Sequence, residues 1–384
     1  MVRLLLALLA AAPAAAQEVP TCEPLFAARP VIAEVEVVHR PPLGPEDRLP
    51  PGLTGAVNRL HRATRPGIVE RELLFHAGER LDRERLRDTL RHLRSLGILR
   101  RERIRCQPLP GDRVRVVVEA QDAWTLLPVF DLQVVDAGTA WTAGVRETNL
   151  AGRGKQLSLT YGNRFGDPEA ALHYLDPRLA GSWWRAAADA VARPDGASLA
   201  AALSHPYYGL ETPWTAALAV ARRTGEEARI EEGVVVSGYR ATRESLRLEW
   251  GRALVAGAPV VHRAGIVFRA GSRRFQPTPS TTTLPRDRSD ASLGLAYRRL
   301  GVGFVTERQI DHFDRPEYVN LANDLALELA AEGPPLGGDR GGLVLALRDA
   351  AGHRFRPGAF VRAAASLSGR LESGRVVDLE AGAG

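Results

Sequence analysis

Apolar and polar residues alternate with a period of two over most of the chain after Trp124. In residues 156–161, Leu157, Leu159 and Tyr161 alternate with polar side chains. The same rhythm recurs along 199–203, 214–220, 246–250, 266–268, 293–297, 325–329 and 343–347. Successive side chains of a strand point to opposite faces, so this pattern predicts antiparallel strands with one apolar face and one polar face.

Two architectures fit this alternation. A transmembrane β-barrel points aliphatic residues at lipid and keeps a wet, charged lumen. A soluble β-sandwich buries the same residues between two sheets. No apolar run is long enough for a spanning helix. We expect about a dozen strands between Trp124 and Gly384.

Residues 31–122 have a different pattern, which mixes both periods. Val31 to Val38 alternates and predicts a strand, and residues 68–76 predict a second one. Between them, Thr54 is the expected N-cap of a helix that stops at Pro66-Gly67.

The next helix is the clearest in the chain. It follows Asp82, places Leu86, Leu90 and Leu93 on one face, and ends at Gly97. A hairpin of 103–107 and 113–120 completes the segment. The sequence therefore predicts a small α+β domain in the order β-α-β-α-β-β.

The first residues have the features of a secretory signal. A short basic start is followed by an apolar run from Leu4 to Ala12 and by the small residues 14–16. We expect a signal peptide at 1–16, a linker at 17–30, and a mature chain outside the cytoplasm. The cysteines are Cys22 and Cys106, and the sequence leaves open whether they are bridged.

Charge adds little to this picture. The formal net charge is +6, and Lys155 is the only lysine, so arginines scattered along the chain carry the positive charge. Because they form no basic tract, we do not expect a nucleic-acid partner.

Two glycine-containing turns carry a resemblance to a known family. One is Glu147-Thr-Asn149-Leu150-Ala-Gly152-Arg-Gly154, and the other runs from Tyr174 through Asp176-Pro177-Arg178 to Ser182. Their sequences and spacing resemble the start of the barrel in the BamA/TamA-type outer-membrane assembly-factor family, the bacterial surface antigens. Trp183 and Trp184 follow the second turn, where an interfacial aromatic girdle is expected.

The preceding domain resembles a POTRA domain of the same family. The matching segments are Gly55 to Thr64 with its Leu60-His61 pair, Arg-Glu-Leu-Leu-Phe-His-Ala-Gly-Glu from Arg71, and Leu-Arg-Ser-Leu-Gly-Ile-Leu from Leu93. The resemblance implies a domain that handles unfolded client chains, with β-augmentation at a sheet edge as the physical basis.

The resemblance implies a layout with a POTRA-like periplasmic domain at 31–122 and an outer-membrane barrel at 123–384. Family barrels have sixteen strands and a late Arg-Gly-Phe/Tyr loop, which this sequence lacks. From the missing closing strand we expect a C-terminally truncated barrel.

The sequence shows no motif for catalysis, cofactor or metal binding. The histidines, among them His61, His92 and His205, are expected on the surface or in the lumen. Asp176 and Arg178 are interpreted as a structural pair, and 277–285 as an exposed loop. We expect a protein that is not an enzyme.

These expectations combine into one functional hypothesis. The chain would be an outer-membrane assembly factor of a Gram-negative bacterium that inserts or translocates client proteins. Its partners would be the lipid bilayer, unfolded outer-membrane clients and accessory assembly proteins. The alternatives are a passive pore or surface adhesin with the same barrel and, further away, a secreted all-β binding protein.

Overall fold

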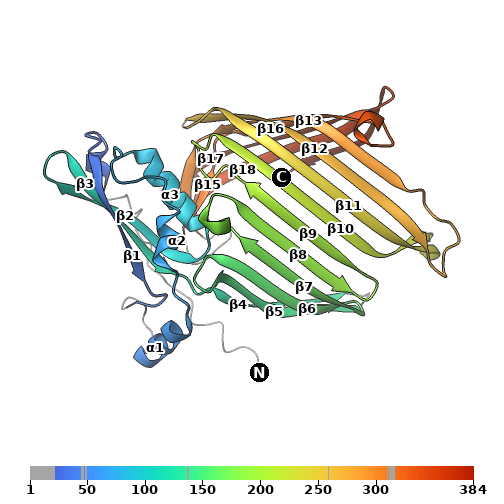
Figure 1. Cartoon of the computed structure of the whole chain (residues 1–384), viewed down its shortest axis with the longest axis horizontal. Helices are drawn as coiled ribbons and strands as arrows, with labels where there is room; N and C mark the ends of the chain where they lie inside the picture. Colours follow the sequence, from blue (N-terminus) through green and yellow to red (C-terminus); the bar gives the residue numbers. More distant parts are fainter. Residues whose placement is uncertain are drawn as a thin grey trace.

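The computed structural model describes residues 22–44, 47, 50–135, 138–257, 259–308, 310 and 316–384. A small α+β domain packs against one end of a large antiparallel sheet (Figure 1). The expected signal peptide at 1–16 and the first linker residues, 17–21, lie outside the described residues.

The N-terminal domain contains a three-stranded sheet and three α-helices. The strand order is β1-β3-β2, with β1 parallel to β3 and β2 antiparallel to it. The elements are the 3₁₀ turn η1 (Glu23–Leu25), β1 (Val31–Arg40), α1 (Pro51–Leu60), α2 (Pro66–Glu70), α3 (Arg83–Ser95), β2 (Leu99–Leu109) and β3 (Arg113–Asp122).

Helix α3 supplies much of the core of this domain. The Asp82 carboxylate accepts hydrogen bonds from the backbone N–H groups of Glu84 and Arg85, as predicted for its N-cap. Leu86, Leu90 and Leu93 are buried on one helix face. Gly97 ends the helix with φ +70°, and Ile98 beside it is buried.

The predicted strand at 68–76 is wrong. Residues Pro66–Glu70 form α2, and the chain then turns through 71–79. Pro66 begins this helix because proline suits a first helical turn, where its missing N–H is not needed. Ile68, Val69 and Phe75 are all buried, so an apolar run that resembled a strand fills the core through a helix and a turn.

The predicted N-cap at Thr54 is also wrong, because α1 begins earlier, at Pro51. Inside that helix the Thr54 hydroxyl donates to the carbonyl of Pro50.

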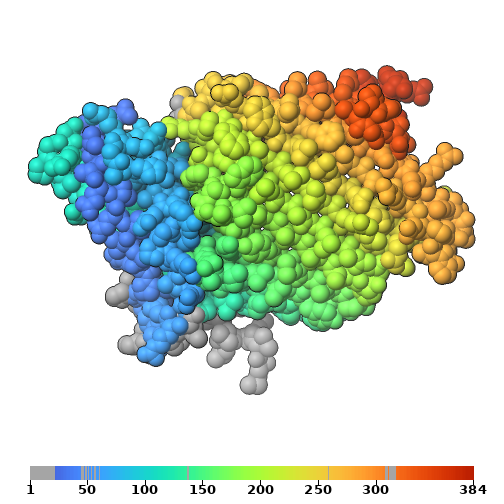
Figure 2. All heavy atoms as spheres, viewed as in Figure 1, coloured from blue at the N-terminus to red at the C-terminus, as the bar shows by residue number. Residues whose placement is uncertain are grey.

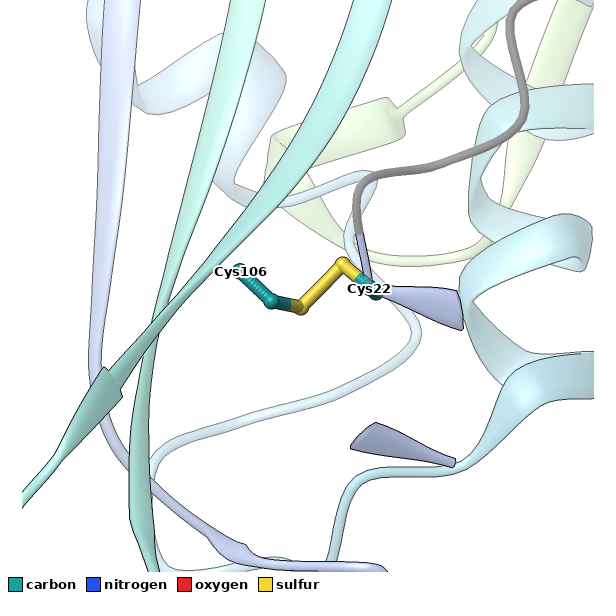
Figure 3. Close-up of a disulfide and its surroundings, with 2 residues drawn as sticks. All are labelled: Cys22 and Cys106. Carbon is teal, nitrogen blue, oxygen red and sulfur yellow. A yellow bond between two sulfur atoms is a disulfide. The ribbon is translucent and has the colours of Figure 1, made fainter. Parts of the chain in front are cut away.

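The cysteines form a disulfide, which answers the question left open by the sequence (Figure 3). The bond joins Cys22 to Cys106 on β2, across 84 residues of sequence. Cys22 is fully buried, and Leu25 and Phe26 pack against the same core. Part of the expected linker at 17–30 therefore belongs to the folded domain.

The large sheet contains fourteen antiparallel strands in sequence order. The hairpin β14–β15 lies between β13 and β16 in the sequence and forms a separate two-stranded sheet. The expected dozen was therefore too low, since the described residues after Trp124 form sixteen strands. The strands are β4 (Leu126–Val135), β5 (Gly138–Leu150), β6 (Lys155–Arg164), β7 (Asp167–Asp176), β8 (Arg185–Arg193), β9 (Gly196–His205), β10 (Trp214–Glu231), β11 (Val234–Val255), β12 (Val260–Pro277), β13 (Arg288–Gly301), β14 (Phe304–Arg308), β15 (Pro316–Asn320), β16 (Asp324–Glu332), β17 (Gly342–Arg356), β18 (Ala359–Glu372) and β19 (Arg375–Ala383). Two further 3₁₀ turns are η2 (Leu179–Gly181) and η3 (Pro334–Leu336).

The sheet curves, with β17 and β18 lying behind the strands at the front (Figure 1). It is not closed, because β4 and β19 are its two outer strands. No helix among the described residues is long and apolar enough to span a bilayer.

The two faces of this sheet differ as the alternation predicts. One cross-strand row joins Leu203, Leu218, Leu248, Phe268 and Leu293. These residues belong to the apolar outer face, where Leu295 is 67% exposed and Phe130 72%. The neighbouring positions form the inner face and carry ion pairs such as Arg247–Glu249 and Arg298–Asp324.

Candidate functional site

The N-terminal domain contacts the large sheet through hydrogen bonds and a buried ion pair. Figure 2 shows the two parts in contact at one end of the strands. Both turns that carry the family resemblance lie at this junction, and each holds a residue of the N-terminal domain.

The first turn joins β5 to β6 and binds the segment between α1 and α2. Asn149 is fully buried and donates from its amide to the Thr64 hydroxyl at 2.8 Å. Its side-chain oxygen accepts the N–H of Gly154 at 2.7 Å, which closes the turn. The Arg65 N–H donates to the carbonyl of Gly152 at 2.9 Å.

Glycine at position 152 is required by this contact. Its φ is +70°, and a Cβ atom there would lie 2.2 Å from the carbonyl oxygen of Ala63. A larger residue would therefore have to push the N-terminal domain away from the sheet.

The second turn follows β7 and contributes a buried ion pair. The Arg178 guanidinium donates from Nε to Glu72 Oε1 at 2.8 Å, and its Nη2 also contacts Glu72. Glu72 is 1% exposed, and His92 of α3 shares its carboxylate. Removing either partner would leave the other charge buried without its main opposite charge, so the pair couples the two domains strongly.

The ion pair perturbs the ionisation of both partners. Burial alone would raise the pKa of Glu72, but the hydrogen bond from His92 and the charge of Arg178 lower that pKa below its ordinary value. Burial lowers the pKa of Arg178, and the Glu72 carboxylate opposes this effect.

The interpretation of Asp176 and Arg178 as a mutual pair needs correction. Asp176 forms its ion pair with Lys155 at 2.9 Å. From Arg178 it accepts a hydrogen bond of the backbone N–H and none of the side chain. The side chain of Arg178 pairs with Glu72, in the other domain. A sequence reading cannot select Glu72 as the partner, because the two residues are 106 positions apart.

Aromatic rings surround the ion pair. The Arg178 guanidinium lies 3.6 Å from the ring centroid of Trp183, and Trp183 stacks on Tyr208 at 3.7 Å. Trp183 therefore packs in the junction, and its predicted place in an outer aromatic girdle is wrong. Trp184 lies beside His205 and Trp214 at the same end of the strands.

Three histidines are also not where they were expected. His61 is buried against Asp122, with 3.0 Å between Nε2 and Oδ2. His92 belongs to the junction ion pair, and His205 is buried in a stack with Trp214. The rings of His61 and His205 are therefore buried inside the protein, whereas His92 is partly exposed and borders the junction.

The loop 206–213, between β9 and β10, lies between α3 and the inner face of the sheet, and we call it the floor loop. Asp88 of α3 accepts the N–H of Leu210 at 3.3 Å, and Arg85 pairs with Glu211 at 3.1 Å. On its other side, the carbonyl of Gly209 accepts a hydrogen bond from Arg263 of β12.

A cavity of about 790 Å³ opens beside this loop, and we call it the junction cavity. Its wall combines cations with aromatic rings. Arg91 lies 4.5 Å from the centroid of Phe304, and Arg94 lies 4.9 Å from that of Tyr318. Both arginines are also ion-paired, Arg91 with Asp88 and Arg94 with Glu102. No local pattern in the sequence reveals this cavity, because its residues come from α3 and from loops and strands far along the chain.

The fold is thus a curved antiparallel sheet with two chemically distinct faces, preceded by a docked α+β domain. No family model matches the chain, and no curated protein matches it. Among solved structures, it is similar to a crystal structure of BamA from Haemophilus ducreyi lacking POTRA domains 1–3. The TM-score is 0.39 and the identity 11%, over 89% of this chain and 57% of that chain.

A second similar structure is CdiB from Acinetobacter baumannii. Its TM-score is 0.42 and its identity 12%, over 90% of this chain and 54% of that chain. The present chain therefore spans little more than half the length of each of these proteins.

Proposed function

We propose that this chain is an outer-membrane protein that helps other polypeptides to insert into, or cross, the outer membrane of a Gram-negative bacterium. The observation that carries the proposal is the apolar outer face of the large sheet. In the described part of the chain, every large hydrophobic side chain that is exposed lies at Trp124 or later. An exposed apolar surface of this extent needs a non-aqueous partner.

Strand length and charge agree with a bilayer as that partner. Strands β6 to β9 are nine or ten residues long, which is the length that a tilted strand needs to cross a membrane. The inner face carries ion-paired arginines and carboxylates, as a water-filled lumen permits. A sandwich is disfavoured, because a second sheet would have to cover the outer face.

The N-terminal domain is proposed to be a POTRA-like module in the periplasm that receives client chains. Its strand β2 is the outer strand of the three-stranded sheet on the side away from β1, which is the position that β-augmentation by a client segment uses. The other edge strand, β1, is partly covered, because Ile32 exchanges backbone hydrogen bonds with Gly78 and Glu79. A client delivered to β2 would then reach the sheet across the junction, with no cofactor or nucleotide involved.

Reconstitution tests this proposal directly. Phospholipid vesicles containing the purified full chain would receive a urea-unfolded outer-membrane barrel, and its folding would be followed by protease protection. We expect faster folding than in empty vesicles. We also expect a loss of this acceleration in Arg178→Ala, because the N-terminal domain is then no longer held at the sheet. Equal rates with and without the chain would reject the proposal.

A passive pore or adhesin is the second candidate, and the ion-paired inner face favours a pore. This function predicts solute efflux from the same vesicles without any change in client folding. Depletion of the chain in cells would then leave other outer-membrane proteins at normal levels.

A further inference from the structure

A second cavity, of about 430 Å³, lies on the inner face of the large sheet. We call it the inner-face cavity. Its wall comes from β10 to β13 and β16 to β18, and Tyr207 and Arg263 border both this cavity and the junction cavity. These two side chains therefore stand at the boundary between the junction and the inner face.

Arg263 is a buried cation without a carboxylate. It is 8% exposed, its Nη2 donates to the carbonyl of Gly209 at 3.2 Å, and its Nε has no partner. Within the described ranges, no carboxylate lies at salt-bridge distance from it. Its guanidinium instead lies 3.9 Å from the ring centroid of Tyr207. A buried charge normally has a counterion, because the loss of water is otherwise uncompensated.

The Tyr207 hydroxyl is a second buried polar group that no other group satisfies. It lies against Gly251, where a Cβ atom would approach it to 3.1 Å. Gly251, Gly265 and Ala296 have little or no side chain, and this leaves room above Arg263 on the inner face. The space therefore adjoins two unused hydrogen-bond donors.

The remaining charges of the inner-face cavity leave it positive. Glu249 pairs with Arg247 at 2.9 Å, and Glu328 pairs with Arg269. Arg348 also borders the cavity, and none of the ion pairs found in the described part of the chain involves it. The carboxylates are thus neutralised by arginines from elsewhere. Arg263 and Arg348 form no ion pair within the described residues, and Asp324, the carboxylate that interacts electrostatically with both, is already paired with Arg298.

We propose that Arg263, Tyr207 and Arg348 form a binding site for an oxoanion, either a carboxylate or a phosphate group. The guanidinium of Arg263 offers its free Nε–H, Tyr207 offers its hydroxyl, and Arg348 adds charge from across the cavity. A carboxylate would come from an acidic side chain of a polypeptide in the lumen, and a phosphate from the free ion in the lumen. The site is independent of whether the chain inserts clients or forms a pore.

Calorimetric titration of the full chain in detergent micelles tests the site. Inorganic phosphate and sodium acetate are added at constant ionic strength, with chloride as the balancing ion. We expect saturable binding of at least one of them and a dissociation constant that rises about 10-fold to 100-fold in Arg263→Gln. Arg340→Gln, which removes the same charge from an exposed loop, should bind as the unmodified chain does.

Tyr207→Phe keeps the test decisive if Arg263→Gln does not fold, because it removes one hydroxyl and no charge. We expect it to weaken binding about 3-fold to 10-fold. No saturable binding of either anion would overturn the proposal. So would equal affinities in Arg263→Gln and Arg340→Gln, or an unchanged affinity in Tyr207→Phe.

The two probes also separate the sources of the anion. Tighter binding of acetate supports a polypeptide carboxylate, and an aspartate-containing peptide should then bind more tightly than its asparagine analogue. Tighter binding of phosphate supports the free ion.

Discussion

The N-terminal domain and the large sheet deal with apolar side chains in opposite ways. The N-terminal domain buries them in one continuous core that includes Ile32, Phe75 and Leu93. The large sheet exposes them along its outer face, where Trp250 and Leu295 are at least half exposed. One chain thus contains a part that folds by excluding water from its own interior and a part whose exposed apolar face needs a non-aqueous partner, which we propose to be lipid.

The largest loss of stability is expected when the disulfide of the N-terminal domain is removed. The bond closes a loop of 84 residues, so replacing Cys22 and Cys106 by alanine should lower the free energy of unfolding by about 4–5 kcal/mol. Thermal unfolding of the full chain, followed by far-UV circular dichroism, would measure this. Reductant should destabilise the unmodified chain and leave the double variant unchanged, whereas equal sensitivity would contradict the prediction.

The junction ion pair should give the next largest effect. Arg178→Ala leaves the Glu72 carboxylate buried with His92 as its remaining partner, which we expect to cost about 3–5 kcal/mol of junction stability. Limited proteolysis would measure this loss as a faster rate of cleavage between residues 122 and 126, in the segment that links the two domains. Arg153→Ala, in the other turn and exposed, is the matched control and should be cleaved at the original rate.

Two neighbouring residues of β10 test the two faces of the sheet. Leu218→Arg puts a charge on the outer face and should cost about 2–4 kcal/mol in a bilayer. Ala217→Arg puts the same charge on the inner face, opposite Glu249, and should cost less than about 1 kcal/mol. Urea titration in lipid vesicles would compare them, and equal losses would reject the assignment of the faces.

A smaller effect is expected from pH. The pKa of Glu72 is lowered in the folded chain, so its ionised form stabilises the junction at neutral pH. This contribution persists above the ordinary glutamate value of 4.5 and is lost as the pH falls below it. Proteolysis of the domain link with an acid-active protease should therefore accelerate below that pH, and Glu72→Gln should remove the dependence.

Local signals in the sequence predicted much of this fold. Asp82, the leucines of α3 and Gly97 define a helix by themselves, because cap, face and terminus agree. The alternation after Trp124 predicted antiparallel strands with two different faces, and the structure confirms it. The strand count was too low because many strands are short of aliphatic residues, such as the alanine-rich β8 (Arg185–Arg193).

What the sequence could not provide depends on contacts between distant segments. The apolar run from Ile68 to Phe75 fits either a strand or a helix followed by a turn, and packing against the rest of the domain selects the helix and turn. Trp183 resembled a membrane-interface residue because its partners, Arg178 and Tyr208, come from separate turns. The role proposed for Arg263 depends on the floor loop and seven strands that meet around one space, which no local pattern encodes.

The floor loop has one further consequence. Residues 206–213 are attached to α3 through Asp88 and Arg85, and to β12 through Arg263. Any tilt of the N-terminal domain would therefore pull directly on the entrance to the inner-face cavity. The position of the N-terminal domain and the shape of this entrance are therefore coupled through only a few side chains.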